Sequence, residues 1–220
     1  MNSPRSAYVH IPFCHKRCFY CDFAIVPLNR KTNGINDNSK KLIESYLDLI
    51  HREIHCSSLG PPLATVYIGG GTPSLLSASQ ISSLIHNLSE KFGIQDGAEI
   101  TLEVDPASFT EDNLDEFIEV GINRFSLGGQ SFSDDVLSSI GRTHSRDQLI
   151  KSCQWIHDRY MEGSLFSWSL DLIQNLPSQN LHKWQCQLDE AIKCSAPHLS
   201  IYDLTIEPGT VFAFQQHRGE

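Results

Sequence analysis

The chain has 220 residues, a formal net charge of -9, and 40% hydrophobic and 20% charged residues. An acidic chain lacks the basic surface that phosphate backbones require, so the composition argues against a nucleic-acid partner. No apolar run is long enough to cross a bilayer, and seven cysteines without framework spacing are typical of a reducing compartment.

We therefore expect no stable membrane span and a cytoplasmic protein, or an organellar one if a longer parent chain carries a transit peptide. The length suits one domain over residues 1–220, with a sizeable core.

The first half of the chain predicts three strands separated by helices. Residues 7–13 form a short expected strand that leads into a cysteine-rich loop. Residues 27–41 are polar and predict a loop, and apolar residues at helical spacing follow over residues 42–54. A second strand is expected at 65–68, a capping box at Ser77 and Gln80, a helix to residue 92, and a third strand at 99–104.

The second half repeats this alternation. Thr110 and Gly121 are typical of the two ends of a helix, and strands are expected at 123–127, 166–173 and 198–204. Helices are expected at 134–140, at 146–160 and around 184–192, with a turn at 207–209. Alternating strands and helices predict an α/β fold with a parallel sheet inside and helices outside. Six units are too few for a closed eight-stranded barrel, so we expect an open (β/α)6 three-quarter barrel.

Polar residues gather where the predicted strands end. They are the three cysteines after the first strand, the glycines at 69–71, Glu103 and Asp105, Gln130, Asp171, Asp203 and Glu207. In parallel α/β folds the carboxyl ends of the strands form the active face. The sequence therefore predicts one polar cavity with the cysteine loop at its mouth.

The cysteine loop carries Cys14, Cys18 and Cys21 in the spacing C-x3-C-x2-C. Thiolates are soft ligands that suit zinc, copper(I) or iron–sulfur clusters. A [4Fe–4S] cluster normally takes four cysteines, so three would leave one iron open to a substrate or cofactor. A zinc ion held by these cysteines with His10 or His15, in a non-enzymatic binding domain, is the alternative.

Other polar and cysteine residues have structural alternatives. The run Gly69-Gly70-Gly71-Thr72-Pro73 lets the backbone approach a ligand closely, but a tight turn explains it equally well. Glu103 alternates with apolar neighbours and should point into the barrel, either toward a ligand or into a structural salt bridge. Arg142 is alternatively a solvated surface charge. No residue is assigned a catalytic role, and His144 is left without one. The remaining four cysteines fall in helical stretches and are interpreted as structural: Cys56, Cys153, Cys186 and Cys194.

The segment from Tyr8 through Cys14, with Cys18 and Cys21, resembles the signature of the radical S-adenosylmethionine (SAM) enzymes. More narrowly, it resembles the oxygen-independent coproporphyrinogen III oxidase family and its haem-chaperone branch. The segments GGGTP, LEVDP, LGGQSF, GRTH and DLI extend the resemblance along the chain to residue 209. The resemblance implies a [4Fe–4S] cluster on the three cysteines and a SAM pocket. The implied SAM contacts are Tyr8, Tyr20, Gly70, Gly71, Thr72, Glu103, Gln130, Arg142 and Asp171.

The resemblance also implies a function. In the superfamily the reduced cluster passes an electron to the sulfonium of SAM, which gives methionine and a 5′-deoxyadenosyl radical. Phe23 stands where the oxidase branch carries a further cysteine, and the longer N-terminal segment of that branch is missing. Both departures favour the haem-chaperone branch, whose role would be to bind haem and deliver it to haem proteins, with a separate electron donor for the cluster. Oxidative decarboxylation of coproporphyrinogen III is the alternative enzymatic function.

Two further departures concern local structure. Gly129 replaces a usual Val, which should loosen that strand end, and Gln174-Asn175 stands where Tyr-Gly is usual. Asn tolerates positive φ better than most residues, so this turn is expected to survive. The family continues into a C-terminal domain that the 220 residues do not include.

Overall fold

The computed structural model describes residues 5–28, 30–31 and 34–219. The strands are β1 (Ser6–Ile11), β2 (Phe13–Cys14), β3 (Val26–Pro27), β4 (Arg30–Lys31), β5 (Gly34–Ile35), β6 (Leu63–Gly70), β7 (Ile94–Val104), β8 (Arg124–Gln130), β9 (Ser167–Gln174) and β10 (His198–Asp203). The helices are α1 (Asp37–Cys56), the 3-10 turn η1 (Pro73–Leu75), α2 (Ala78–Phe92), α3 (Glu111–Glu119), α4 (Asp134–Ser139), α5 (Arg146–Met161), α6 (Leu181–Lys193) and α7 (Val211–Arg218).

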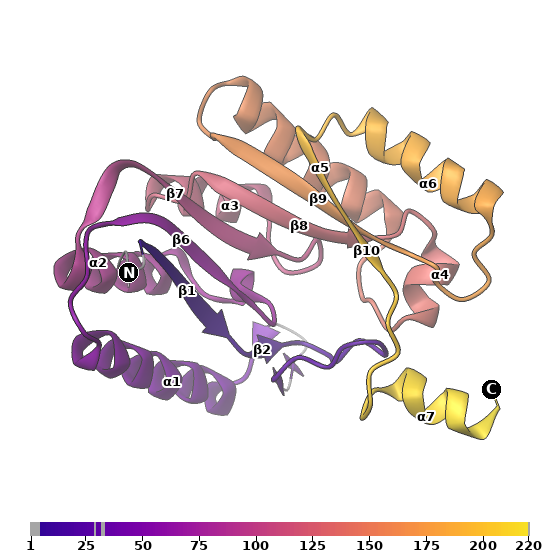
Figure 1. The fold of residues 1–220 in the computed structure, drawn as a ribbon, viewed down its shortest axis with the longest axis horizontal. Helices are drawn as coiled ribbons and strands as arrows, with labels where there is room; N and C mark the ends of the chain where they lie inside the picture. Colours follow the sequence, from indigo (N-terminus) through magenta and orange to yellow (C-terminus); the bar gives the residue numbers. More distant parts are fainter. Residues whose placement is uncertain (1–4, 29, 32–33, 220) are drawn as a thin grey trace.

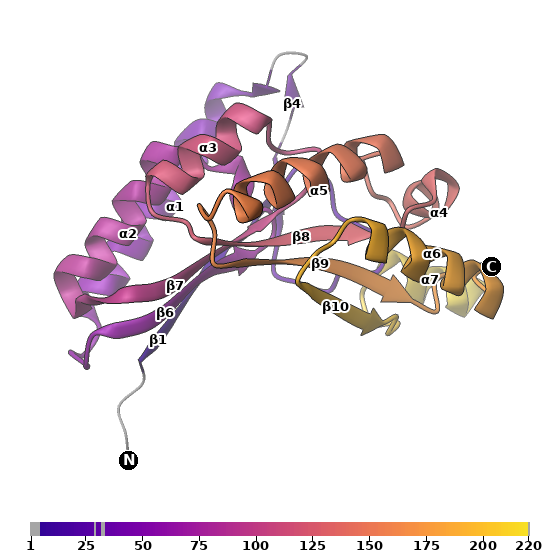
Figure 2. The same ribbon diagram turned by 90° about the horizontal axis from the view of Figure 1, so that it is seen from above.

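Six strands form one parallel sheet in the order β1-β6-β7-β8-β9-β10. The sheet is curved, and α1, α2, α3 and α5 cover one face of it (Figures 1 and 2). The strand order follows the chain, so the helices from α1 to α6 lie in connections between neighbouring parallel strands, and α7 follows the last strand. This arrangement confirms the expected open (β/α)6 barrel with its sheet inside and helices outside.

The two faces of the sheet differ because side chains alternate along each strand. Leu102 on β7, Leu127 on β8 and Trp168 on β9 point toward the helices and are completely buried. Glu103 and Ser126, which are adjacent to these residues in sequence, point to the opposite, inner face. Burying a large apolar side chain contributes roughly 1.5–3 kcal/mol, so the outer face holds the sheet against its helices. The inner face is left free to be polar.

The expected loop at residues 27–41 is wrong in its last part. Helix α1 begins at Asp37, because the Asn36 side chain accepts a hydrogen bond of 2.8 Å from the Ser39 backbone N–H. The polar run around Asn36 is therefore a helix cap with an acidic first turn, which favours a helix start. The preceding part contains the short antiparallel pair of β4 and β5. Strand β7 is also longer than expected and begins at Ile94.

The structural interpretation of the four helical cysteines fits only two of them. Cys153 is buried in the core and Cys194 is partly buried against it. Cys56 and Cys186 are exposed on their helices, so the interpretation is wrong for them. None of the seven cysteines is in a disulfide. Within the part of the chain that the structure describes, no helix has the length and apolarity to span a membrane.

Candidate functional site

A cavity of about 500 Å³ opens at the carboxyl ends of the sheet strands. This volume lies within the usual range of small-molecule sites. Every strand end that was expected to meet there contributes: the cavity is lined by Cys14, Cys18, Cys21, Gly70, Gly71, Thr72, Glu103, Asp105, Gln130, Arg142, Asp171, Asp203 and Glu207, among others. The predicted convergence of the strand ends on one cavity beside the cysteine loop is therefore confirmed, but apolar atoms make up the larger part of its lining, so the cavity is less polar than expected.

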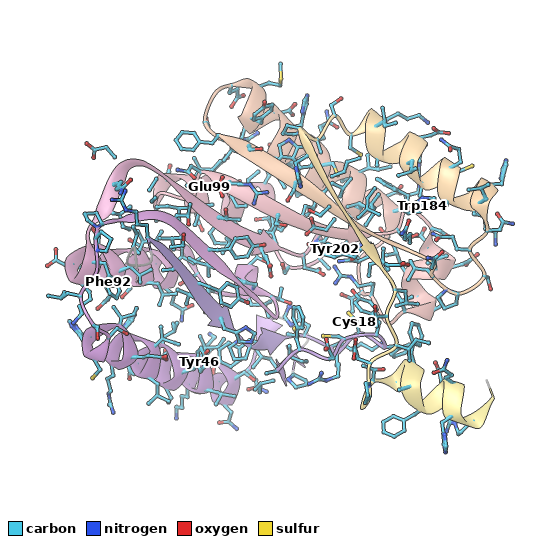
Figure 3. All side chains as sticks on the ribbon, viewed as in Figure 1. Cys18, Tyr46, Phe92, Glu99, Trp184 and Tyr202 are labelled. Atoms are coloured by element: carbon cyan, nitrogen blue, oxygen red, sulfur yellow. The ribbon has the colours of Figure 1, made fainter. Side chains whose placement is uncertain are left out.

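All three thiols of the cysteine loop face this cavity, and two contact residues from other elements. Thr72 Oγ1 donates to Cys14 Sγ at 3.4 Å, and Arg142 Nη1 lies 3.9 Å from Cys18 Sγ. Burial raises the pKa of the Cys14 thiol to about 11, and the neighbouring Cys21 and Cys18 add to the rise. In Figure 3, Cys18 lies near the segment that joins β10 to α7, far from Glu99 at the other end of the sheet.

The glycine run after β6 approaches the cysteine loop very closely. A Cβ on Gly71 would lie 2.7 Å from the Phe13 carbonyl oxygen and 3.0 Å from Cys14 Sγ. Gly70 has φ of +116°, and a Cβ there would lie 2.6 Å from the His10 ring. The run is therefore more than a tight turn, because any side chain would displace the loop that carries the first thiol.

Glu103 is held by two donors on the inner face. Tyr67 Oη donates to Oε1 at 2.8 Å, and the Gly70 N–H donates to Oε2 at 2.9 Å. Burial raises the pKa of Glu103, although both hydrogen bonds act to lower it. No ion pair with Glu103 is found among the described residues, so the alternative of a structural salt bridge is not supported.

Asp171 lines the cavity and has one buried carboxylate oxygen without a hydrogen-bond partner among the described residues. Its Oδ2 accepts a hydrogen bond of 2.8 Å from Ser126 Oγ, which in turn accepts one of 3.0 Å from Ser169. Its Oδ1 is buried and has no hydrogen-bond partner in the described part of the protein. Burial raises the pKa of Asp171. A buried acceptor without a donor is costly, so this atom marks a place where a ligand donor would fit.

Arg142 is a buried ion-pair residue, which corrects the alternative of a solvated surface charge. Its Nη2 lies 2.5 Å from Asp105 Oδ2 and donates to the Gly128 carbonyl at 2.6 Å. Only 11% of the Arg142 side chain is exposed. Burial acts to lower the pKa of Arg142, but Asp105, with Tyr20 and Cys18, outweighs it and raises the pKa overall. The guanidinium therefore stays charged beside the cysteine loop.

Gln130 reaches the cavity from a strained backbone. Its φ is +63°, at a register irregularity between β8 and β9. His144 Nε2 lies 3.1 Å from the Gly129 carbonyl oxygen and therefore carries the proton that it donates. Burial, followed by the charge of Arg142, lowers the pKa of His144 to about 4, so this imidazole is neutral. Together with the bond from Arg142 to Gly128, it fixes the irregular strand end that carries Gln130.

The two tyrosines of the expected SAM pocket lie in different places. Tyr20 is part of the cavity wall, and burial raises its pKa. Tyr8 does not line the cavity: it is 59% exposed, stacks on Tyr67 with ring centroids 5.9 Å apart, and lies 3.2 Å from His10 Nδ1 through its hydroxyl. Tyr8 therefore adjoins the site through the Tyr67–Glu103 pair.

The two local departures are accommodated. A Cβ on Gly129 would lie 2.8 Å from Leu170 Cδ1 and 3.0 Å from Leu149 Cδ1, so neighbouring leucines already fill the space of a larger residue. The expected loosening of this strand end is therefore not observed. Asn175 has φ of +60° as expected, and its side-chain amide donates to Asp203 at 2.5 Å.

Sequence reasoning missed several residues that shape the site. Asp105 was placed at a strand end without a partner, and Tyr67 and Ser126 were not singled out. Tyr67 and Ser126 share the inner face with Glu103 through the alternation of their strands, so a period of two residues was the signal for them. The Asp105–Arg142 pair joins residues far apart in the chain and left no local signal.

The described residues contain no ready-made site for a single metal ion. Across residues 5–28, 30–31 and 34–219, no group of three or more His, Cys, Asp or Glu side chains is placed to hold one metal ion. Zinc sites need all their ligands within about 2.0–2.3 Å of one ion. Three thiols around one cavity supply three of the four thiolate ligands that a [4Fe–4S] cluster normally takes.

Comparison with known proteins gives consistent results. The sequence model of the radical SAM superfamily matches residues 8–185. The chain is 39% identical to the heme chaperone HemW of Synechocystis over 218 residues, which cover 99% of this chain and 51% of the relative. It is 35% identical to the heme chaperone HemW of Escherichia coli, with 95% and 53% covered. The chain therefore spans about half the length of the curated relatives it matches.

A solved structure gives the same fold. The coproporphyrinogen III oxidase HemN from Escherichia coli, a radical SAM enzyme, superposes with a TM-score of 0.82 and 31% identity. The match covers 98% of this chain and 47% of that one. The radical SAM methyltransferase TsrM from Kitasatospora setae, at 11% identity and a TM-score of 0.64, shares the fold alone.

Proposed function

The chain belongs to the radical SAM superfamily, and from this premise we propose that it binds a [4Fe–4S] cluster and SAM in the cavity beside its cysteine loop. Cys14, Cys18 and Cys21 would hold three irons and leave the fourth for SAM. When bound, the cluster supplies the electron for reductive cleavage of the SAM sulfonium.

The residues present fit these two groups. Three soft thiols line one cavity, and the glycine run leaves a cradle that a Cβ at Gly71 would fill. Asp171 lines the same cavity, and its under-satisfied carboxylate suits a ligand hydroxyl or amine. Glu103 is oriented by Tyr67 and Gly70, so it presents a fixed carboxylate to a cationic ligand. Each of these features supports a ligand that carries both charges and hydrogen-bond donors.

The cavity residues would act by binding and orienting. Arg142 places a permanent positive charge beside Cys18, where it offsets the negative charge of thiolate ligands. Gln130 adds amide groups from the strained strand end. Tyr20 adds an aromatic wall that excludes water from the thiols. These roles require no proton transfer by a side chain, so no catalytic residue is assigned.

We propose that the biological role is that of a haem chaperone, with haem and haem-accepting proteins as partners and a separate electron donor. One observation favours this role over the oxidation of coproporphyrinogen III. Phe23, two residues after Cys21, lines the cavity mouth where the oxidase branch resembled above has a further cysteine. In the described residues, only Cys14, Cys18 and Cys21 contribute thiols to the cavity. A reducing compartment such as the cytoplasm suits seven free thiols, and we place the protein there.

The test uses the protein that carries these 220 residues at its native length. It is incubated anaerobically with SAM, a reductant and coproporphyrinogen III, and the products are separated by chromatography. In parallel, haem is titrated into the protein and its transfer to an apo haem protein is followed by absorbance. We expect haem binding and transfer without porphyrin product. Formation of protoporphyrinogen IX at enzymatic rates would establish the oxidase function in its place.

A further inference from the structure

Arg17 has an unusual environment inside the cysteine loop. Its guanidinium donates to three backbone carbonyls: from Nη1 to Cys21 at 3.1 Å and to Phe23 at 3.0 Å, and from Nη2 to Ile25 at 3.3 Å. It forms no ion pair among the described residues. A partly buried guanidinium that donates only to backbone carbonyls stabilises the loop conformation, because its rigid planar group satisfies several acceptors at once.

The segment that Arg17 holds has no regular secondary structure, and its other contacts are the burial of Ile25 and the His10 ring, whose Nε2 lies 3.0 Å from the Ala24 carbonyl oxygen. Residues 22–25 belong to no helix or strand, and the chain re-enters a ladder only at β3, beside β2. Within the loop, the Cys21 N–H donates to the Cys18 carbonyl at 3.2 Å. Arg17 lies between the first and second cysteines and reaches past the third. Its three bonds therefore fix the position of Cys21 relative to Cys14 and Cys18.

The charge of Arg17 also lies close to the thiols. The Arg17 guanidinium donates to the backbone carbonyl of Cys21, whose thiol is one of the three expected metal ligands. Arg17 also lines the cavity. Lys16, its neighbour, also lines the cavity, but it is exposed and its Nζ lies 5.2 Å from the centre of the Phe19 ring. Of these two cations, Arg17 alone ties the backbone of the loop.

We propose that Arg17 is a positioning residue for the metal centre: it holds Cys21 in place through the carbonyls of residues 21, 23 and 25, and its charge stabilises the electron-rich cluster that the loop would hold. The inference rests on the proposed function, because it presupposes a cluster on the three cysteines. It concerns how long the cluster is retained and how readily it is reduced.

The experiment compares Arg17→Gln, Arg17→Lys and the matched control Lys16→Gln after anaerobic reconstitution. Three quantities are measured: the rate at which a chelator removes iron, the midpoint potential of the cluster by an EPR-monitored titration, and the melting temperature of the protein with and without its cluster. Lys keeps the charge but lacks the fork. We therefore expect both Arg17 variants to lose iron about tenfold faster, the effect of about one lost hydrogen bond.

The midpoint potential distinguishes the effect of the Arg17 charge from the effect of its hydrogen bonds to the loop. We expect it to fall in Arg17→Gln and to stay near the wild-type value in Arg17→Lys, since only the first removes a positive charge. Lys16→Gln should retain iron at the wild-type rate. Wild-type iron retention and potential in both Arg17 variants would overturn the inference, and so would an equal effect of Lys16→Gln. If the Arg17 substitutions lowered the melting temperature equally with and without the cluster, Arg17 would stabilise only the fold. That result would also overturn the inference.

Failure of this inference differs from failure of the proposed function. If the wild-type protein takes up no iron, the cluster itself is refuted. If it takes up iron and the Arg17 variants match it in every measurement, only the role of Arg17 is refuted. Should Arg17→Gln not fold, Arg17→Lys alone decides, because it preserves the charge and most of the volume.

Discussion

The Arg142 guanidinium and the Asp105 carboxylate form a buried ion pair, with Nη2 2.5 Å from Oδ2 and only 11% and 19% of the two side chains exposed. Asp105 also accepts from the Ala107 N–H at 2.9 Å, so its orientation is fixed independently of Arg142. The pair connects the end of β7 to the loop before α5 and holds a cation beside Cys18.

Asp105→Asn should destabilise the protein by about 3 kcal/mol, because it leaves a buried guanidinium without a counter-charge. Thermal or denaturant unfolding of the cluster-free protein measures this. The matched control is Glu190→Gln, which breaks the more exposed Arg146–Glu190 pair and should cost less than about 1 kcal/mol. Equal effects of the two substitutions would mean that the Asp105 pair is no more important than a surface contact.

Asp171→Asn should stabilise the ligand-free protein at neutral pH by about 1 kcal/mol, since it removes a buried charge with an unpartnered oxygen while Ser126 keeps an acceptor. The unfolded carboxyl titrates near pH ~3.9, and burial raises the folded pKa. As the pH rises, the unfolded chain therefore loses its proton first, and the wild type loses stability up to the folded pKa.

The gain from Asp171→Asn should consequently vanish under acidic conditions, where the wild-type carboxyl is protonated in both states. Denaturant unfolding at several pH values measures it, and a gain that is the same at every pH would contradict the assignment. The same variant should bind SAM about tenfold more weakly, because a charged acceptor makes the stronger hydrogen bond.

Glu103→Ala should weaken SAM binding by at least about tenfold while leaving the iron content unchanged, because it removes a carboxylate that faces the cavity. Calorimetry on the reconstituted protein measures the affinity. Glu99→Ala is the matched control: it removes a carboxylate four residues earlier on β7, outside the cavity wall (Figure 3). Unchanged affinity in Glu103→Ala would show that the SAM site is placed wrongly.

Gly71→Ala should lower stability by about 2 kcal/mol and impair iron retention, since its Cβ would lie 2.7 Å from the Phe13 carbonyl and 3.0 Å from Cys14 Sγ. Gly163→Ala serves for comparison. Gly163 has φ of +81° with nothing within 4 Å of a Cβ, so only the backbone strain of about 1 kcal/mol remains. If Gly163→Ala impaired iron retention as much, the effect would not arise from the contact with Cys14.

Much of this architecture was predictable because it depends on local patterns. Alternation along the strands fixes which side chains face inward, and parallel strands bring their carboxyl ends together, so Glu103 and Asp171 could be placed in one cavity. The start of α1 was missed because Asn36 suits both loops and helix caps.

Other features depend on contacts between distant segments. The Arg142–Asp105 pair and the packing of Leu149 and Leu170 into the space beside Gly129 form only when the strands and helices have assembled. The position of Tyr8 outside the cavity wall depends in the same way on its stacking against Tyr67 on the neighbouring strand. Such contacts have no sequence period, which is why a single sequence did not reveal them.

The most direct test of a cluster with an open iron is the EPR spectrum of the anaerobically reconstituted, reduced protein with and without SAM. We predict about four irons and four sulfides per chain, a signal that changes when SAM is added, and loss of that signal in Cys18→Ser. Stoichiometric zinc without iron in the freshly purified protein, or a cluster signal that SAM leaves unchanged, would contradict this account.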